Sequence, residues 1–475
     1  MKFTLSLLVG FLTIGSVSSA VLNPSSSQSL SKSSSTSTQL PSLQIDSRFV
    51  VKIRDASLGA LYRIEGSSDL LTWTAAGPVI EVREQNFVAP LPFGNDAYRF
   101  FRYAQFVPEA VVSLSVESPE FKLASGGTVG VRASVFKLRM SGEAGFLERL
   151  GLRLSSGSGQ SIVYVSVWEG SEKVGETVFT GNRRTALATL TRLVLLPKGQ
   201  DKSITVKIDL ACVGAACGGI PGDIIRIDHN DGSDPLLQTR IIGASSGRTV
   251  PLKGETHSAG VQLMKSFPII ALDPLPANGA ADGRLLRYKV TADSRGPVST
   301  AKFTILFDAS NSFVTNVTLY GFTDSSYSQP VSGFGSGGKL DSQDISSEPV
   351  GGFVPAVRSY VPLYCRRLDG TKAAVTVPAD STYYFEIRGG FVPRPTTANG
   401  TGVTVTPPTV IFTLLGDSTP PSRPLLNVGV VEDQGKNLIW SPNSYGQSVL
   451  TDADWTSGYA VPGLPPVGIT QLRTN

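Results

Sequence analysis

Charged residues are scarce in this chain, and histidine is scarcer still. Asp, Glu, Lys and Arg make up 17% of the 475 residues, and the formal net charge is +4. So dilute a charge, with no Lys/Arg cluster interleaved with aromatic residues, excludes a nucleic-acid-binding surface of the usual kind. The two histidines, His229 and His257, stand outside any motif that would make either a general base, so we expect both in loops or linkers.

Cysteine is also rare, with three residues in the whole chain. This count excludes a four-cysteine metal knot. Cys212 and Cys217 are close enough, in the run ACVGAACGG, for a local disulfide across a glycine-rich loop in an oxidising compartment. Two free thiols remain the alternative, because a bridge that closes so short a loop contributes little stability. Cys365 has no obvious partner.

Long apolar runs are absent after the first twenty residues, so we expect no transmembrane segment in the mature chain. The chain begins with one lysine, an apolar run and small residues, MKFTLSLLVGFLTIGSVSSA. This layout predicts a secretory signal peptide over residues 1–20, cleaved after Ala20, since the run is too short for a comfortable membrane anchor. Residues 21–44 are Ser-rich with few apolar side chains, and they predict a flexible linker.

Glycine and proline, by contrast, are plentiful, with 49 and 31 residues. Together with many Ser and Thr residues they favour a turn-rich, all-β chain. Short runs such as FVVKIRD and AYRFFRYAQFV, separated by Gly, Asp and Pro, predict a small β module over residues 45–108.

The next two segments repeat one design. The run VFKLRMSGEAGFLERLGLRLS corresponds to RYKVTADSRGPVSTAKFTILFD, and VYVSVWEG corresponds to VTNVTLYG. Phe136 therefore matches Tyr288, and Trp168 matches Tyr320. Apolar residues alternate with polar ones and no 3.6-residue period is present, so we predict two tandem antiparallel β-sandwiches, immunoglobulin-like in architecture, over residues 109–252 and 253–417.

The end of the second repeat and the segment after it carry a family resemblance. The runs TYYFEIRGG, FTLLGDS and NLIWSPNSYGQSVLTDADWTSGYAVPGLP resemble uncharacterised secreted surface proteins of ultra-small candidate-phylum bacteria. In that family tandem immunoglobulin-like modules precede an "IWS…DWTNGY…GLP" stretch, and this chain departs from it with Ser457 in place of Asn. The resemblance implies a β-sandwich fold and a surface location, and it supplies no biochemical activity.

Residues 418–475, called the C-terminal arm below, hold a Pro-containing linker and the first group of candidate site residues. Trp440, Tyr445, Trp455 and Tyr459 could form a stacking platform for sugars, or they could pack on the second sandwich or a partner chain. We favour packing, because four exposed aromatic side chains would make an aggregation-prone patch. The arm is predicted to be irregular, with short strands, and to dock through its side chains.

The second candidate site is the acidic run DHNDGSDP. It places Asp228, Asn230, Asp231 and Asp234 in one tight loop, with the oxygen ligands that Ca²⁺ prefers. Its spacing is not that of an EF-hand, and a solvated Asx-rich turn explains the same residues. The G-x-S-x-G pattern at residues 243–247 lacks the helix that a nucleophile elbow needs, so we attribute it to chance.

These observations lead to an expected function. We expect a secreted, non-enzymatic protein of the cell surface or envelope, with a structural or adhesive role and with surface proteins or glycans as partners. We expect no cofactor other than the calcium considered above. The alternatives are a carbohydrate-binding module protein and, third, an extracellular hydrolase, for which the chain offers no convergent carboxylates or nucleophile–base spacing.

Overall fold

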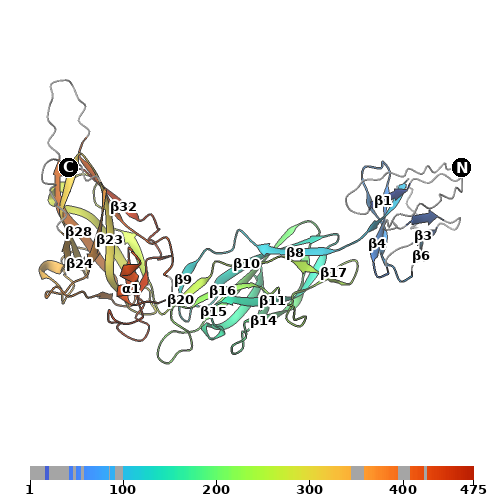
Figure 1. The fold of residues 1–475 in the computed structure, drawn as a ribbon, viewed down its shortest axis with the longest axis horizontal. Coiled ribbons are helices and arrows are strands. Elements are labelled where there is room, and N and C mark those ends of the chain that lie inside the picture. The colour runs from blue at the N-terminus through green and yellow to red at the C-terminus, as the bar shows by residue number, and fades with distance from the viewer. Residues whose placement is uncertain are drawn as a thin grey trace, which may run out of the picture.

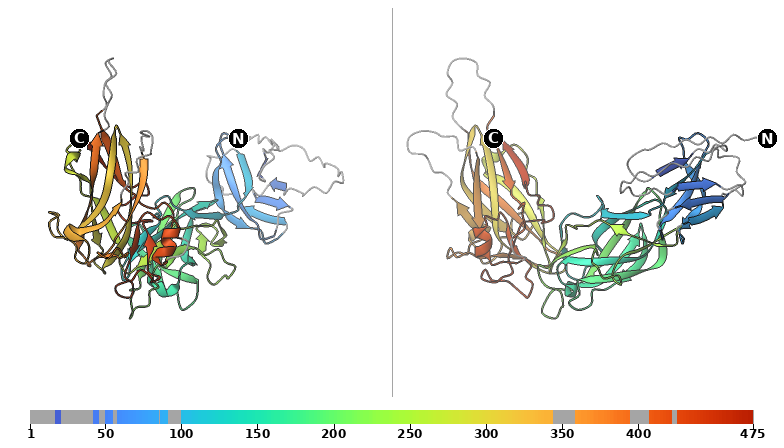
Figure 2. Two further views of the ribbon diagram at one scale, coloured as in Figure 1. Left: turned by 60° about the vertical axis from the view of Figure 1, so that its left-hand side comes forward. Right: turned by 45° about the vertical axis from the view of Figure 1, so that its right-hand side comes forward.

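The fold is almost entirely β. The computed structural model describes residues 17–20, 42–45, 50–54, 58–84, 86–90, 100–343, 358–393, 407–421 and 425–474. Strands make up 53% of the structure and helices 4%, and the strands lie in several antiparallel sheets, so the predicted fold class is confirmed. Figure 1 shows three β bodies that follow one another along the longest axis, and both views of Figure 2 place the first sandwich in the middle. In the described part of the chain, no helix has the length and hydropathy to cross a membrane.

The N-terminal module contains two small sheets. The first has the order β1 (Val17–Ala20), β7 (Phe100–Gln105), β4 (Leu61–Ser67) and β5 (Thr74–Glu81), and the second β2 (Ser42–Ile45), β3 (Val50–Arg54) and β6 (Asn86–Pro90). β1 falls within the predicted signal peptide, so cleavage after Ala20 would remove this edge strand and leave β7–β4–β5. Of the predicted linker, residues 42–44 lie in β2, and residues 21–41 lie outside the described residues.

The first sandwich is one continuous 13-stranded sheet that folds over on itself. Its elements are β8 (Glu109–Leu114), β9 (Lys122–Ser125), β10 (Val131–Ser141), β11 (Gly145–Ser156), η1 (Gly159–Ser161), β12 (Ile162–Glu169), β13 (Glu172–Thr177), β14 (Thr185–Leu196), β15 (Asp201–Leu210), β16 (Ile224–His229), β17 (Arg240–Gly243), β18 (Thr249–Val250), β19 (Leu252–Lys253) and β20 (Val261–Met264). Every second residue of β15, from Ile204 to Leu210, is buried, as its alternating sequence predicts.

The second sandwich has separate sheets of five and seven strands. Its elements are β21 (Pro268–Leu272), η2 (Ala280–Asp282), β22 (Arg284–Ala292), β23 (Val298–Ser310), β24 (Ser312–Phe322), η3 (Ser336–Gly338), β25 (Lys339–Gln343), β26 (Arg358–Tyr364), β27 (Val375–Val377), β28 (Thr382–Pro393) and β29 (Thr409–Leu414). The C-terminal arm adds α1 (Val428–Asp433), β30 (Ile439–Ser441), β31 (Thr456–Ser457) and β32 (Ile469–Thr474).

The two sandwiches share one strand order. In the first, β8–β10–β15–β12 form one layer and β14–β11–β16 the other; in the second, the corresponding runs are β21–β22–β28–β24 and β26–β23–β29. The predicted repeat is thus confirmed at the level of topology. It also extends to the matched side chains.

The register of the paired strands agrees between the copies as well. In the first sandwich Phe136 lies opposite Ile204, and Trp168 lies opposite Thr205, the next residue of β15. In the second sandwich Tyr288 lies opposite Phe385, and Tyr320 lies opposite Glu386, the next residue of β28. The aromatic residue on β12 and its counterpart on β24 also each have a cation over the ring, Lys207 over Trp168 and Arg388 over Tyr320.

The boundary between the sandwiches lies later in the chain than the sequence pattern predicts. By sheet membership it falls between Met264 and Pro268, because β20 pairs with β16 and β9 of the first sandwich. The polar, turn-like residues before β20 favour a boundary at residue 253 when the pattern is considered alone. The junction is also packed, since Leu123 of β9 and Met264 of β20 belong to the hydrophobic core of the second sandwich.

Candidate binding cleft at the C-terminal arm

The arm joins the second sandwich through backbone pairing as well as through side chains. β30 pairs with β23, and β32 pairs with β29 along its whole length. The sequence predicts an irregular arm with short strands that docks through its side chains, because Asp452 and Asp454 are poor strand residues and Gly, Ser and Pro punctuate the segment. Nearly all of β23 is buried, and the side chains of the arm pack against part of it. The arm therefore completes the sandwich.

Trp440 and Trp455 are the two largest side chains that this packing buries completely. The indole of Trp440 lies in the main core of the second sandwich, and its N–H donates to the carbonyl oxygen of Ser457 at 2.7 Å. Trp455 packs with Val431 of α1 and with Ala301 of β23, and its N–H donates to the carbonyl oxygen of Val449 at 2.9 Å. Neither indole has a face free to stack on a ligand.

A buried carboxylate organises the loop between these tryptophans. Asp454 accepts hydrogen bonds from the hydroxyls of Ser441, Ser444 and Ser448 at 3.0, 2.6 and 2.6 Å, and from the backbone N–H of Ser444 at 2.8 Å. Four donors compensate the loss of water around this charge. No sequence pattern marks this role, since each partner is an ordinary serine in a Ser-rich chain.

A second buried carboxylate holds the entry to β30. Asp417 accepts from the backbone N–H groups of Asn437 at 2.9 Å, Leu438 at 3.3 Å and Gly458 at 2.7 Å. These residues lie on two separate segments of the arm. Asp417 therefore ties both segments to the end of the second sandwich, and sequence reasoning missed it because its partners are backbone groups.

The two tyrosines of the arm have different surroundings. Tyr459 is half-buried, and its ring lies 5.0 Å from the ring of Phe121, which comes from the segment before β9 of the first sandwich. Tyr445 is 71% exposed. Of the four aromatic residues considered from the sequence, Tyr445 alone presents most of its ring to solvent.

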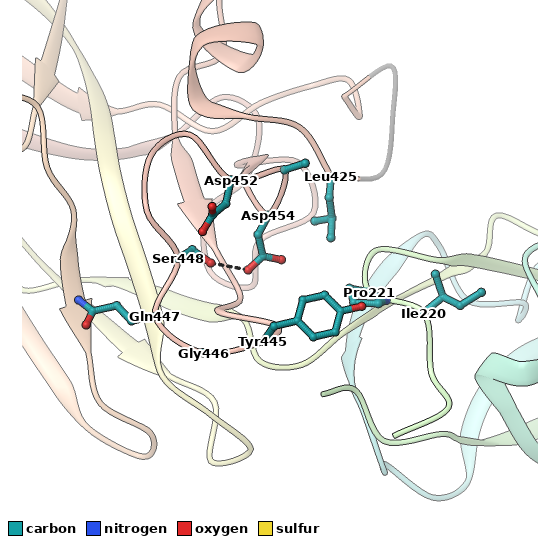
Figure 3. Close-up of a pocket in the computed structure, with 10 residues that line it drawn as sticks. Ile220, Pro221, Leu425, Tyr445, Gly446, Gln447, Ser448, Asp452 and Asp454 are labelled. Carbon is teal, nitrogen blue, oxygen red and sulfur yellow. Dashed lines mark hydrogen bonds between the residues drawn. The ribbon is translucent and has the colours of Figure 1, made fainter. Parts of the chain in front are cut away.

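Tyr445 lines a cleft of about 690 Å³ between the arm and the first sandwich. The first sandwich contributes Ile220 and Pro221, and the arm contributes Leu425 with residues 445–448 and 452–454. Figure 3 shows the Tyr445 ring reaching from the arm toward Pro221, with Leu425 on the other side of the space and Asp454 at its inner wall. The volume lies in the range of small-molecule sites, about 300–1,000 Å³.

The wall from the first sandwich follows directly after a disulfide. Cys212 and Cys217 are bonded, with their Cα atoms 5.2 Å apart, and the free Cys365 is fully buried. The backbone N–H of Gly219 donates to the carbonyl oxygen of Cys212 at 2.9 Å, which folds the chain back beyond the bridge. The bridged loop thereby positions Ile220 and Pro221 at the cleft.

The four residues considered as calcium ligands do not converge on one point. No group of three or more His, Cys, Asp or Glu side chains suited to a metal occurs among the described residues. The carboxylate of Asp228 is buried and accepts from the backbone N–H of Ser258 at 2.7 Å, Asp231 pairs with Arg153 at 2.7 Å, and Asp234 accepts from the backbone N–H of Leu236 at 3.0 Å. Asn230 donates to the carbonyl oxygen of Leu237 at 2.9 Å. Each side chain thus has its own protein partner, an arrangement that agrees with the Asx-rich turn considered as the alternative to a calcium site.

His229 and the G-x-S-x-G run also have structural roles. His229 is the last residue of β16, buried, rather than a loop residue as predicted, whereas His257 is exposed in a loop. Burial lowers the pKa of His229 to about 4. In the run at residues 243–247, the backbone N–H groups of Ser245 and Ser246 donate to the buried carboxylate of Glu143 at 2.6 and 2.9 Å. The serines are thus engaged in holding a turn.

Comparison with known proteins does not assign this chain to a family. No protein-family model matches the chain, and no curated protein matches it. Among solved structures, similarity is found to manganese lipoxygenase of Gaeumannomyces graminis determined with part of zonadhesin of Komagataella pastoris, at 11% identity, with 64% of this chain and 88% of the other covered and a TM-score of 0.13. A protein from Corynebacterium diphtheriae named as membrane-anchored is 12% identical to this chain. The match covers 86% of this chain and 99% of the other, with a TM-score of 0.14.

A third solved structure is a tetra-tandem repeat from the extending region of a large adhesion protein. It gives 10% identity, 77% coverage of this chain, 90% coverage of the other and a TM-score of 0.10. At TM-scores this low, none of the three similarities supports an inference about this chain. Its function has to be argued from its own residues.

Proposed function

We propose that this chain is a secreted, non-enzymatic protein of the cell surface or envelope, and that it acts as an elongated structural or adhesive element. Three β bodies follow one another along the long axis of the molecule (Figure 1). This arrangement suits a spacer that carries a binding surface away from its point of attachment. The signal-like first twenty residues and the resemblance to secreted surface proteins support the same location.

The observation that carries the proposal is that the junction between the sandwiches is built from specific contacts. Lys265, between β20 and β21, donates from its Nζ to the carbonyl oxygen of Asn443 in the arm at 2.9 Å. Phe121 packs on Tyr459 across the same junction, and Leu123 and Met264 enter the second core. A linker of independent domains would have few such contacts. The contacts favour two sandwiches that move as one stiff body.

The N-terminal module is attached through an arginine of the first sandwich. Arg248 pairs with Glu81, and its guanidinium also donates to the carbonyl oxygen of Gly59 at 3.1 Å. Both partners lie in or near the β4–β5 sheet. These two contacts join the N-terminal module to the first sandwich.

Surface biotinylation of intact cells that make the protein, followed by fractionation, tests the proposal. We expect the mature chain to be labelled in intact cells and to be recovered with the envelope. A chain protected from the reagent, and recovered with soluble interior proteins, would contradict it.

A carbohydrate-binding protein is the second candidate, and the cleft beside Tyr445 is the observation that favours it.

A further inference from the structure

The cleft beside Tyr445 has the composition of a site for a ring that has apolar faces and carries hydroxyl groups. One side is the Tyr445 ring, and the opposite side is formed by Leu425, with Ile220 and Pro221 completing the apolar surface (Figure 3). Tyr445 is 71% exposed although it stands between two parts of the molecule. An exposed aromatic face in a concave site is available for a ligand with an apolar face of its own.

The charged groups that line the cleft are two carboxylates, Asp452 and Asp454, and Gln447 and Ser448 add neutral polar side chains. Asp452 is exposed, and its carboxylate accepts one hydrogen bond, from the backbone N–H of Val449 at 2.8 Å. Its remaining acceptor positions face solvent. Asp454 at the inner wall is occupied by its serine donors, which fixes the shape of the wall. None of the residues that the structure places around the cleft is Lys, Arg or His. This charge balance disfavours an anionic ligand and favours one that donates hydrogen bonds.

We propose that this cleft binds a neutral oligosaccharide, with a sugar ring stacked on Tyr445 and a hydroxyl donated to Asp452. A pyranose ring has apolar C–H faces and a rim of hydroxyl donors, which matches the two kinds of surface found here. The inference deepens the adhesive part of the proposed function and rests on it. Biotinylation tests location independently, so a failure of sugar binding is distinguishable from a failure of the surface proposal.

The wall of the cleft is rigid, which supports binding at low entropic cost. The loop that presents Tyr445 is fixed on one side by Asn443, whose side-chain oxygen accepts from the backbone N–H of Ser448 at 2.9 Å and from Ser299 of β23 at 3.1 Å. On its other side, Ser448 is bonded to Asp454. A preorganised loop loses little freedom when a ligand binds.

Saturation-transfer NMR on the whole chain that remains after signal cleavage tests the site. Tetrasaccharides of glucose, mannose and N-acetylglucosamine serve as separate probes. We expect transfer to at least one probe, and loss of about tenfold or more in affinity in Tyr445→Ala and in Asp452→Asn. Matched controls are Tyr360→Ala, a tyrosine 59% exposed on β26, and Asp433→Asn at the end of α1. Both controls should bind as the unaltered chain does.

Two results would overturn the inference. One is the absence of transfer to all three tetrasaccharides at millimolar concentration. The other is binding that Tyr445→Ala and Tyr360→Ala leave equally intact, which would place the sugar elsewhere on the molecule. Because Tyr445 is exposed, its replacement should leave the melting temperature unchanged, so unfolding is not expected to obscure the measurement.

Discussion

At the scale of single residues, the indoles of Trp440 and Trp455 are buried and hold the arm on the second sandwich, so they are not exposed for ligand binding. Replacing Trp455 by Ala should destabilise the second sandwich by roughly 3–5 kcal/mol, because a fully buried indole leaves a cavity and an unpaired carbonyl at Val449. The unfolding transition assigned to this sandwich, followed in denaturant, measures the loss. Tyr445→Ala is the matched control and should change it by less than about 0.5 kcal/mol. An unchanged transition in the Trp455 variant would contradict the packing described here.

His229 predicts a dependence of stability on acidity. Its pKa is about 4 in the folded chain, lowered from 6.5 by burial, so the unfolded chain takes up the proton more readily. The stability that its neutral form contributes is therefore complete above pH 6.5 and is lost as the pH falls from about 6.5 to 4. Melting temperatures of the unaltered chain and of His229→Gln across this range provide the check. The substitution should flatten the slope; equal slopes would exclude His229 as its source.

At the scale of elements, the loop between β30 and β31 depends on one carboxylate. Asp454→Ala leaves three serine hydroxyls and a buried backbone N–H without their acceptor, so residues 441–455 should open together. Hydrogen exchange of peptides from the arm should show faster exchange confined to this segment. Asp452→Asn, an exposed neighbour, serves as control. Exchange that is equally fast in both variants, or unaltered in both, would contradict the role given to Asp454.

The disulfide loop makes a prediction about thiol chemistry. In the native, unreduced chain no thiol should react, because Cys365 is fully buried and burial raises its pKa to about 12. Denaturation without a reductant should expose one thiol, and reduction should release all three cysteines of the chain. Thiol counting under these three conditions decides the matter. Three reactive thiols before reduction would show that Cys212 and Cys217 are not bridged.

At the scale of the whole molecule, two long side chains connect the three bodies. Lys265→Ala should broaden the distribution of shapes at the junction of the sandwiches, and Arg248→Ala should do so at the N-terminal module. Small-angle scattering of the mature chain, analysed for the spread of maximum dimensions, measures this. Lys253→Ala removes an exposed ion pair within the first sandwich and should leave the spread unchanged. Identical scattering from all three variants would show that packing alone holds the junctions.

The β class, the repeat and its register follow from the amino-acid sequence alone. Alternation along a strand records which face is buried, so the alternating pattern is sufficient to match Phe136 with Tyr288 and Trp168 with Tyr320. These features are local, because each depends on neighbours only two residues apart. The small β module, the sandwiches and the aromatic content of the arm follow from the same kind of pattern.

The roles of the polar residues, in contrast, depend on tertiary structure. The serines around Asp454, the backbone amides around Asp417 and the contact of Lys265 with Asn443 join segments that lie far apart in the chain or that no pattern distinguishes. The acidic run at residues 228–234 is suited to calcium by composition, yet Arg153 and Ser258, supplied by other strands and loops, take up its carboxylates. Hydrogen-bond partners are chosen by proximity in space, and a sequence pattern carries that information only where the partners are neighbours in the chain.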